Sequence, residues 1–210
     1  MARDGFPIVL SAASGTGKTT LAHLLRQRDE CLALSISHTT RPPRGDEKNG
    51  IDYHFVDEET FQHMVDDAAF LEWACVHGHR YGSGAEATEA LMQRSRDVVF
   101  DIDVQGANQI KRRLPRALLI FILPPSLDVL RGRLQRRGTD SRDEVDRRMA
   151  VARREIETGL DTFDFVIINE NLDDALVDVA ALIRGRRLGD VDRHAIRARL
   201  LGPSTILERP

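Results

Sequence analysis

Cysteine and proline are scarce in this chain of 210 residues, which holds 2 Cys and 8 Pro and has no long apolar run. Few prolines and 41% hydrophobic residues exclude a disordered chain and predict one large globular domain or two small ones. The longest apolar run, 117–123, falls far short of the roughly 20 residues that span a bilayer. The first residues, MARDGFPIVL, also lack a signal-peptide core, so we expect a cytoplasmic protein without a membrane partner.

The two cysteines, Cys31 and Cys75, lack the spacing of metal ligands. Cys75 lies in the apolar-rich segment FLEWACV, and thiols in such segments are mostly buried and structural. We therefore expect Cys75 to be buried.

An excess of positive charge is also missing, because 30 basic residues face 33 acidic ones and leave a net charge of -3. This balance argues against a dedicated nucleic-acid binder, which would have a basic domain. The average hides a local imbalance, however, since nine arginines and only four acidic residues lie between 131 and 154.

Short apolar runs alternate with amphipathic stretches along the chain. This alternation predicts an α/β fold whose parallel sheet is covered by helices on both faces. The expected strands are 7–11, 31–35, 98–102, 118–123 and 165–168, and the expected helices are 18–28, 104–113, 126–136, 141–156 and 172–186.

The segment 39–81 interrupts this alternation. It begins with TTRPPRGDEKNG, whose Pro, Gly and Asn residues indicate turns, and continues with short polar strand-like pieces. We interpret it as an insertion with a small sheet of its own. The last residues, from Gly189 onward, are polar and rich in Arg, and we expect a peripheral helix and tail there.

The run SAASGTGKTT follows the first expected strand and precedes a helix, which is the setting of a Walker A phosphate loop. Its glycines let backbone N–H groups turn toward an anion, Lys18 supplies charge for the β- and γ-phosphates, and Thr19 supplies a hydroxyl for Mg²⁺. Ala12 stands where the pattern has its first Gly, and Ala disfavours backbone angles that Gly tolerates. A chance Gly-rich turn is the alternative, which the position after the first strand disfavours.

Polar residues in and after the insertion suggest a second site. Arg41 and Arg44 flank two prolines, and stiffened guanidinium groups suit a phosphate monoester. The hydroxyl of Tyr53 could reach the same phosphate, and Tyr81 and Ser83 add further hydroxyls.

Glu72 is a lone carboxylate in the apolar run FLEW. A buried carboxylate needs hydrogen-bond donors, and guanine offers two adjacent donors where adenine does not. The alternative is a structural Glu that caps a helix or pairs with an Arg.

The motifs SASGTGK, SHTTRPPR, NGIDYHF, FLEWA, YGS, DIDVQGA and RRGTD, in this order, resemble guanylate kinases, which phosphorylate GMP with ATP. The resemblance covers roughly 8–186. It implies a P-loop three-layer fold with a central parallel sheet flanked by helices, a small mixed-sheet GMP-binding insertion and a helical lid. The implied parts are a core of 1–36, 95–126 and 159–187, a GMP-binding insertion of 37–94, a lid of 127–158 and a tail of 188–210.

The resemblance also implies roles for individual residues. Ser37 and Glu72 would bind guanine, with Ser83 beside the base. Asp101 and Asp103 would lie near Mg²⁺ and guanine, with the choice between them for the metal left open; Thr19 and Asp101 are the candidate ligands. The GMP phosphate would contact Arg41, Arg44, Tyr53 and Tyr81, and ATP would contact Ala12, Ala13, Ser14, Gly15, Thr16, Gly17, Lys18, Thr19, Thr20 and Asn169.

Three arginines of the basic cluster, Arg133, Arg137 and Arg148, match the family's lid arginines. Phosphoryl transfer depends mainly on positioning and on neutralising charge, and a movable lid can bring arginines only after both substrates bind. We expect the others to form a solvated helix face, namely Arg136, Arg142, Arg147, Arg153 and Arg154. A nucleic-acid patch is the alternative, but the cluster lacks interleaved aromatic residues.

The expected reaction is in-line attack of a GMP phosphate oxygen on the γ-phosphate of Mg²⁺-bound ATP, without a general base. Two alternatives remain: a peptide-binding domain like those of scaffold proteins, and a related kinase with another phosphorylated substrate. The presence of Lys18 and the lid arginines argues against the first, and Glu72 with Ser37 argues against the second. Whether the protein is a monomer or a homo-oligomer is left open.

Overall fold

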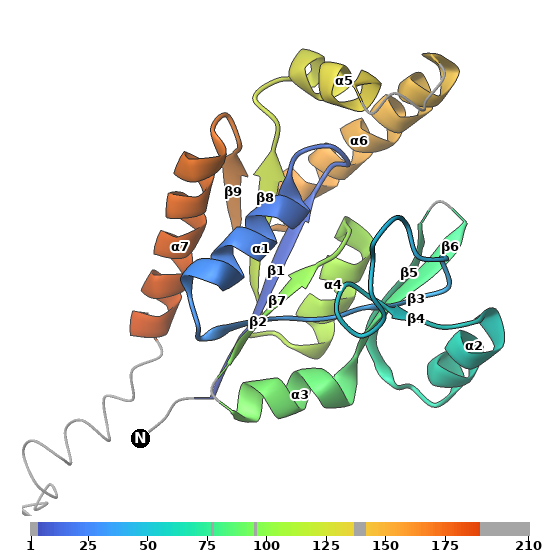
Figure 1. Ribbon diagram of the computed structural model, residues 1–210. Coiled ribbons are helices and arrows are strands. Elements are labelled where there is room, and N and C mark those ends of the chain that lie inside the picture. Colours follow the sequence, from blue (N-terminus) through green and yellow to red (C-terminus); the bar gives the residue numbers. More distant parts are fainter. Residues whose placement is uncertain (1–3, 77, 95, 137–141, 190–210) are drawn as a thin grey trace, which may run out of the picture.

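Five parallel strands form the central sheet of the computed structural model, which describes residues 4–76, 78–94, 96–136 and 142–189 (Figure 1). The strand order is β2-β7-β1-β8-β9, and every neighbouring pair is parallel. The predicted parallel sheet is therefore confirmed. The strands are β1 (Pro7–Ala12), β2 (Leu32–Leu34), β7 (Asp97–Asp101), β8 (Leu118–Leu123) and β9 (Phe165–Ile168).

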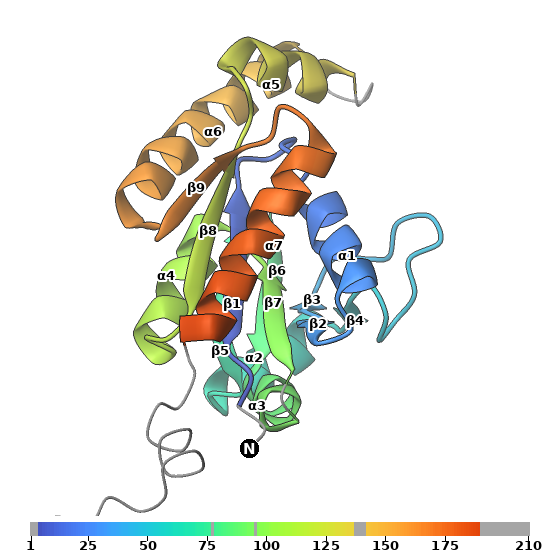
Figure 2. The same ribbon diagram turned by 90° about the vertical axis from the view of Figure 1, so that its left-hand side faces the viewer.

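Alternating side chains of β1 fill two cores, one on each face of the sheet. Ile8 and Leu10 pack with helices α1 (Lys18–Arg28) and α7 (Leu172–Gly189). Val9 points to the other face and packs in the core that includes α4 (Val104–Arg113). Figure 2 shows α1 and α7 on one side of the sheet and α4 on the other. Burial on both faces explains why the strands are continuously apolar.

The second sheet has four strands in the order β4-β3-β6-β5 and is mixed, because β3 pairs parallel with β4 and antiparallel with β6. All four strands lie between residues 38 and 84. The sequence predicts this small sheet, whereas the domain bounds given above stay a prediction. The strands are β3 (His38–Thr39), β4 (His54–Phe55), β5 (Phe70–Val76) and β6 (His79–Gly84).

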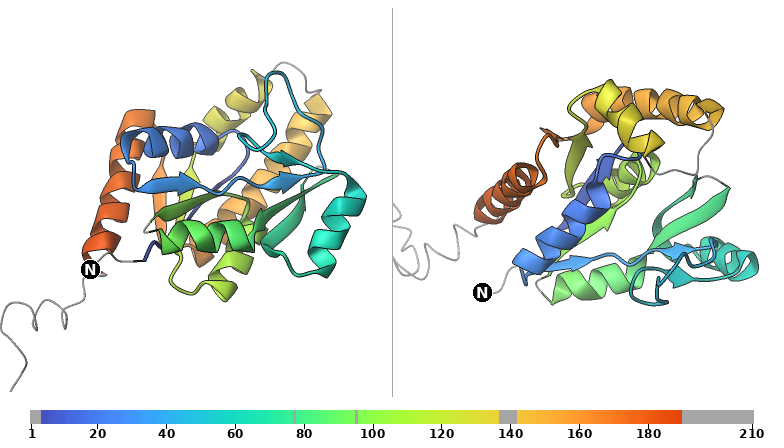
Figure 3. Two further views of the ribbon diagram at one scale, coloured as in Figure 1. Left: turned by 60° about the horizontal axis from the view of Figure 1, so that its bottom comes forward. Right: turned by 45° about the horizontal axis from the view of Figure 1, so that its top comes forward.

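Two further helices, α2 (Glu58–Asp66) and α3 (Ala85–Gln93), were not expected from the sequence. The side chain of Asp57 caps α2 by accepting a hydrogen bond from the N–H of Thr60 at 2.7 Å. Such a cap satisfies one of the unpaired donors in the first turn of a helix. Figure 3 shows α2 beside the second sheet, whereas α3 lies nearer the central sheet, where Leu91 and Met92 pack against the core that includes Val98.

The expectation of a buried Cys75 is wrong, because this thiol is exposed. The pairing of β5 with β6 shifts register between Phe70 and Glu72. This irregularity leaves Phe70, Leu71 and Glu72 all buried, after which burial alternates along the strand. Cys75 therefore falls on the outward face together with Trp73.

Helices α5 (Leu127–Gln135) and α6 (Arg142–Thr162) lie together at one end of the molecule (Figure 1). The hydroxyl of Ser126 caps α5 by accepting from the N–H of Val129. Helix α6 runs beyond its predicted end at 156, and Gly159 lets it pack against β8: a Cβ there would lie 2.7 Å from the ring of Phe121. In the part of the chain that the structure describes, no helix has the length and apolar character of a membrane span.

A partly buried cluster of ion pairs fixes the end of α7 to the central sheet and to the end of α1. The Nε of Arg187 donates to Asp97 Oδ2 at 2.7 Å, and its NH1 donates to Asp29 Oδ2 at 2.6 Å. Asp97 is fully buried at the start of β7 and also accepts from the N–H of Phe6. Because the strands are parallel, their carboxyl ends lie at the opposite edge of the sheet, where most of the predicted site residues follow them.

Candidate active site

The phosphate loop follows β1 and ends where α1 begins. Gly15 and Gly17 have φ angles of 95° and 96°, in the left-handed region that favours glycine. Helix α1 starts at Lys18, directly after Gly17. The N-terminal end of α1 therefore points its free N–H groups toward the loop, as expected for an anion site.

Ala12 is the last residue of β1, where it pairs with Ile122 of β8. Its methyl group is buried in the core between the sheet and helices α1 and α7. Among the described residues, the only non-glycine with positive φ is Ala68, so Ala12 has an ordinary backbone conformation. The position of the pattern's first Gly is thus part of the strand, and Ala is compatible with it.

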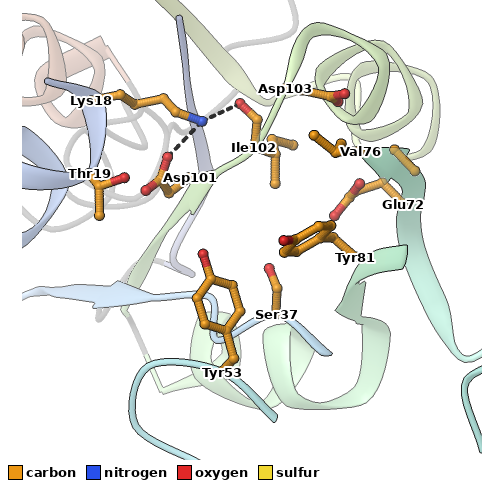
Figure 4. Close-up of a pocket in the computed structure, with 11 residues that line it drawn as sticks. Lys18, Thr19, Ser37, Tyr53, Glu72, Val76, Tyr81, Asp101, Ile102 and Asp103 are labelled. Carbon is orange, nitrogen blue, oxygen red and sulfur yellow. Dashed lines mark hydrogen bonds and ion pairs between the residues drawn. The ribbon is translucent and has the colours of Figure 1, made fainter. Parts of the chain in front are cut away.

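Lys18 is held by the end of β7. Its Nζ lies 2.6 Å from Asp101 Oδ1 and donates to the carbonyl oxygen of Ile102 at 2.6 Å (Figure 4). Asp101 and Asp103, between which the sequence does not choose a metal ligand, thus have different surroundings. Asp101 lies beside Lys18, whereas Asp103 caps α4 by accepting from the N–H of Gly106 at 2.8 Å.

A cavity of about 220 Å³ joins the phosphate loop to the second sheet. Figure 4 shows Lys18 and Asp101 at one side of it, and Glu72, Tyr53 and Tyr81 at the other. Eight of the residues expected at the phosphate loop or second site lie close together here, although they come from distant parts of the sequence. The lining consists of Lys18, Thr19, Ser37, Tyr53, Glu72, Ala74, Val76, Tyr81, Asp101, Ile102 and Asp103.

Glu72 is only 3% exposed, as expected for a carboxylate in an apolar run. It lies opposite Ser83 in the pairing of β5 and β6, and the hydroxyl of Ser83 donates to Glu72 Oε1 at 2.6 Å. Burial raises the pKa of Glu72 to about 7, although the Ser83 hydrogen bond opposes the shift. A buried carboxylate with a single side-chain donor is suited to a ligand that brings more donors.

Two residues of α4 that position Glu72 were not found from the sequence. A Cβ on Gly106 would lie 2.5 Å from Glu72 Oε2, so any larger residue at this position would displace the buried carboxylate. Gln109 donates to the carbonyl of Trp73 at 2.8 Å and accepts from its N–H at 3.2 Å, which ties α4 to β5. A glycine inside a helical pattern was the available signal for Gly106; Gln109 had none.

The two arginines of the TTRPPR motif differ. Arg41 is 5% exposed, its Nε donates to Tyr81 Oη at 3.2 Å, and its guanidinium lies 5.3 Å from the ring centre of Tyr53. Arg44 is exposed. Neither lines the cavity directly, but Arg41 contacts two tyrosines that do.

A second cavity, of about 210 Å³, lies on the other side of the phosphate loop. Asn169, just after β9, is buried there and donates to the carbonyl of Thr16 at 2.7 Å. Arg133 of α5 reaches the carbonyl oxygens of Thr16 and Asn169, each at 3.4 Å. The lining consists of Gly15, Thr16, Gly17, Thr20, Arg133, Asn169, Glu170 and Leu172.

Helix α6 contacts the loop at Ser14. Arg148 donates to the hydroxyl of Ser14 at 2.8 Å, and Glu155 accepts from the backbone N–H of Ser14. Burial and the charge of Asp103 raise the pKa of Glu155 to about 7. No motif in the sequence singles out this carboxylate.

Of the three arginines assigned to the lid, Arg133 and Arg148 lie on the loop side of the site. Arg133 and Arg148 touch the loop but do not line the Lys18–Glu72 cavity, and Arg137 lies outside the described residues. Arg136, Arg153 and Arg154 are exposed, and Arg147 forms an exposed ion pair with Glu144 at 2.9 Å. The side chain of Arg142 also lies outside the described part.

No group of three or more His, Cys, Asp or Glu side chains suited to a metal occurs within the described ranges. Thr19 and Asp101 both line the cavity beside Lys18. Mg²⁺ is commonly held by one or two protein oxygens together with substrate phosphates. A hydroxyl and a carboxylate at a phosphate loop fit this ion.

Comparisons with known proteins agree with this geometry. The family model "Guanylate kinase" matches residues 4–186. The chain is 50% identical over 193 residues to the guanylate kinase of Neisseria meningitidis serogroup B, covering 89% of this chain and 94% of the relative. It is 46% identical over 183 residues to that of Myxococcus xanthus, covering 87% and 88%. A crystal structure of guanylate kinase from Anaplasma phagocytophilum has a TM-score of 0.79 at 28% identity and covers 97% of this chain and 99% of that one. The chain therefore belongs to the guanylate kinase family.

Proposed function

We propose that this chain transfers the γ-phosphate of ATP to GMP, giving ADP and GDP, across the cavity between its phosphate loop and its second sheet. One observation carries the proposal: Lys18 of the loop and Glu72 of the second sheet line the same cavity. A phosphate-binding group and a buried carboxylate suited to guanine thus lie at opposite sides of one space.

The donor nucleotide would bind along the phosphate loop. The loop from Ala12 to Thr20 would surround the phosphates with backbone N–H groups, and Lys18 would leave Asp101 to contact the β- and γ-phosphates. The cavity beside Asn169 and Arg133 is the proposed place of the adenine end.

The acceptor would bind on the second sheet. Glu72, with its partner Ser83 and with Ser37 nearby, would accept the two adjacent donors of guanine. Asp103, at the N-terminus of α4, lines the same side of the cavity. Tyr53, Tyr81, Arg41 and Arg44 would hold the phosphate, because guanidinium and hydroxyl groups together match its oxygens.

Thr19 and Asp101 are the proposed ligands of Mg²⁺. When bound with ATP, the ion would neutralise charge that develops on the phosphate oxygens. Asp101 now pairs with Lys18, so release of the lysine to the phosphates would free this carboxylate.

Arg133, Arg137 and Arg148 would contribute positive charge after both nucleotides bind. Arg133 and Arg148 already touch the loop through Thr16 and Ser14. Helices α5 and α6 would also exclude water from the transferring phosphate, which limits hydrolysis of ATP. No general base is required, because the GMP phosphate is largely ionised near neutral pH.

A coupled assay of ADP release tests the proposal. With ATP and Mg²⁺ present, GMP should support turnover far above AMP, CMP or UMP. Glu72→Gln should narrow this preference, since a site that pairs with specific donors can discriminate by about 10⁴-fold. Equal rates with AMP and GMP in the unmodified protein would contradict the choice of guanine, and binding of GMP without turnover would point to a domain that only binds.

A further inference from the structure

Glu47 forms a two-pronged contact with Arg41. Its Oε1 accepts from Arg41 NH2 at 3.0 Å, and its Oε2 lies 3.0 Å from Arg41 NH1. Both prongs of the guanidinium thus face the carboxylate, a geometry that fixes the plane of the group as well as its position. Glu47 lies in the DEKNG turn and has no place in the function described so far.

Most of the N–H groups of Arg41 are already in use. Its Nε donates to Tyr81 Oη, and NH1 donates to the carbonyl of Pro42 at 2.7 Å in addition to facing Glu47. An arginine has five such donors. Its guanidinium also lies over the rings of Tyr53 and Phe55. The group is therefore held in one orientation before any phosphate arrives.

Glu47 is itself fixed by the backbone. Its Oε2 accepts from the N–H of Arg44 at 2.7 Å, and its own N–H donates to the carbonyl of Arg44 at 3.1 Å. The hydrogen bond from Arg41 lowers the pKa of Glu47, which keeps the carboxylate ionised. Because the turn 44–47 depends on this carboxylate, Glu47 is part of the loop and not a stand-in for a phosphate that would leave.

We propose that Glu47 is a positioning residue for the acceptor site: it fixes the orientation of Arg41, and through Arg41 that of Tyr81, so that both meet the phosphate of GMP. This inference rests on the proposed function. It also separates the roles of the two arginines. Arg41 supplies a fixed geometry with part of its charge balanced by Glu47, and the exposed Arg44 supplies the charge that attracts the phosphate.

Glu47→Gln tests the proposal, with Asp46→Asn as the matched control, because Asp46 is the exposed neighbouring carboxylate and its removal changes the net charge equally. Calorimetric binding of GMP should weaken by about tenfold or more in Glu47→Gln, as expected for loss of a charge-assisted contact. Guanosine, which has no phosphate, should bind both variants as it binds the unmodified protein. In kinetics, the KM for GMP should rise more than kcat falls, while the KM for ATP stays unchanged.

A second comparison separates positioning from folding. In an Arg41→Lys background, which lacks the planar fork, Glu47→Gln should weaken GMP binding by less than threefold. Glu47→Asp, which keeps the charge, should recover part of the affinity if Glu47→Gln folds poorly. Unchanged or tighter GMP binding by Glu47→Gln would overturn the proposal, as would an equal loss of guanosine binding. Absence of GMP binding by the unmodified protein would instead overturn the proposed function.

Discussion

The carboxyl group of Glu72 is buried with only Ser83 as a side-chain donor, and this burial raises its pKa to about 7. The proton is bound more tightly in the folded state than in the unfolded chain, where the pKa is near 4.5. The contribution of Glu72 to folding stability is therefore fully present below about pH 4.5 and is lost as the pH rises through about 7. In the proposed function, this loss of stability accompanies a carboxylate placed to accept hydrogen bonds from guanine.

This linkage predicts that Glu72→Gln is more stable than the unmodified protein at pH 8, by on the order of 3 kcal/mol. At pH 4 the difference should vanish, because Glu72 is then protonated in both states. Urea unfolding at the two pH values measures both differences. A variant that is less stable at pH 8 would show that the carboxylate is better solvated than its burial indicates.

Gly106 is the second residue that we expect to control guanine binding. A methyl group at this position would lie 2.5 Å from Glu72 Oε2, and neither α4 nor β5 can yield easily because Gln109 joins them. We predict that Gly106→Ala weakens binding of both GMP and guanosine by at least tenfold and leaves ATP binding intact. Calorimetric titration with each ligand tests this. Equal loss of ATP binding would indicate general damage to the sheet edge.

Helix α6 packs against β8 through a glycine. A Cβ at Gly159 would lie 2.7 Å from the buried ring of Phe121, whereas a Cβ at Gly132 of α5 would meet nothing within 4 Å. We predict that Gly159→Ala destabilises the protein by about 1–3 kcal/mol through overpacking. Gly132→Ala should instead stabilise it by about 0.5–1 kcal/mol, since Ala favours a helix over Gly.

Thermal or urea unfolding of the two variants gives the comparison directly. Their opposite signs are the essential result, because both substitutions add the same methyl group to a helix. If both variants gained stability, α6 would have to sit farther from β8 than the structure places it.

Elements with a strong periodic pattern could be predicted from the sequence, and elements defined by tertiary pairing could not. The five strands of the central sheet were expected within two residues at each end, because each is a continuous apolar run. Helix α2 was missed because the segment 39–81 was interpreted from its turns and polar strand-like pieces, and α3, which follows that segment, was not predicted. The exposed Cys75 was missed because a register shift in β5 follows from its pairing with β6.

For the molecule as a whole, Trp73 offers a measure of how the second sheet responds to ligands. It is the only tryptophan, it is 39% exposed beside Glu72, and its backbone is tied to α4 through Gln109. We predict that GMP changes its fluorescence, while ATP alone has a much smaller effect. Titration with each nucleotide measures this, with Trp73→Phe as the blank. An equal response to ATP would mean that the phosphate loop and the second sheet move together.

The site was predictable where the type of residue and its motif indicate a chemical role, as for Lys18 in the phosphate loop and Glu72 in an apolar run. It was not predictable where a residue acts by holding another one. In the sequence, Glu47 resembles an ordinary turn residue. Gly106 and Gln109 lie more than 30 residues from Glu72 and Trp73, which they contact. Only the tertiary packing shows what these three residues hold in place. The different burial of Arg41 and Arg44 was not predictable for the same reason. The two arginines flank the same pair of prolines in the sequence, and only their tertiary contacts distinguish them.

The ion pair between Lys18 and Asp101 affects how strongly the phosphate loop binds small anions such as free phosphate. In the resting protein the ammonium already has a carboxylate and the carbonyl of Ile102 as partners. Binding of free phosphate would replace one anionic partner of Lys18 by another. The ion pair with Asp101 therefore disfavours binding of free phosphate to the loop. In the proposed function, a nucleotide would contact the backbone N–H groups and a base-binding site together, and could therefore replace these partners. We therefore expect the loop to favour a nucleotide over free phosphate, because the ligand must replace the partners of Lys18.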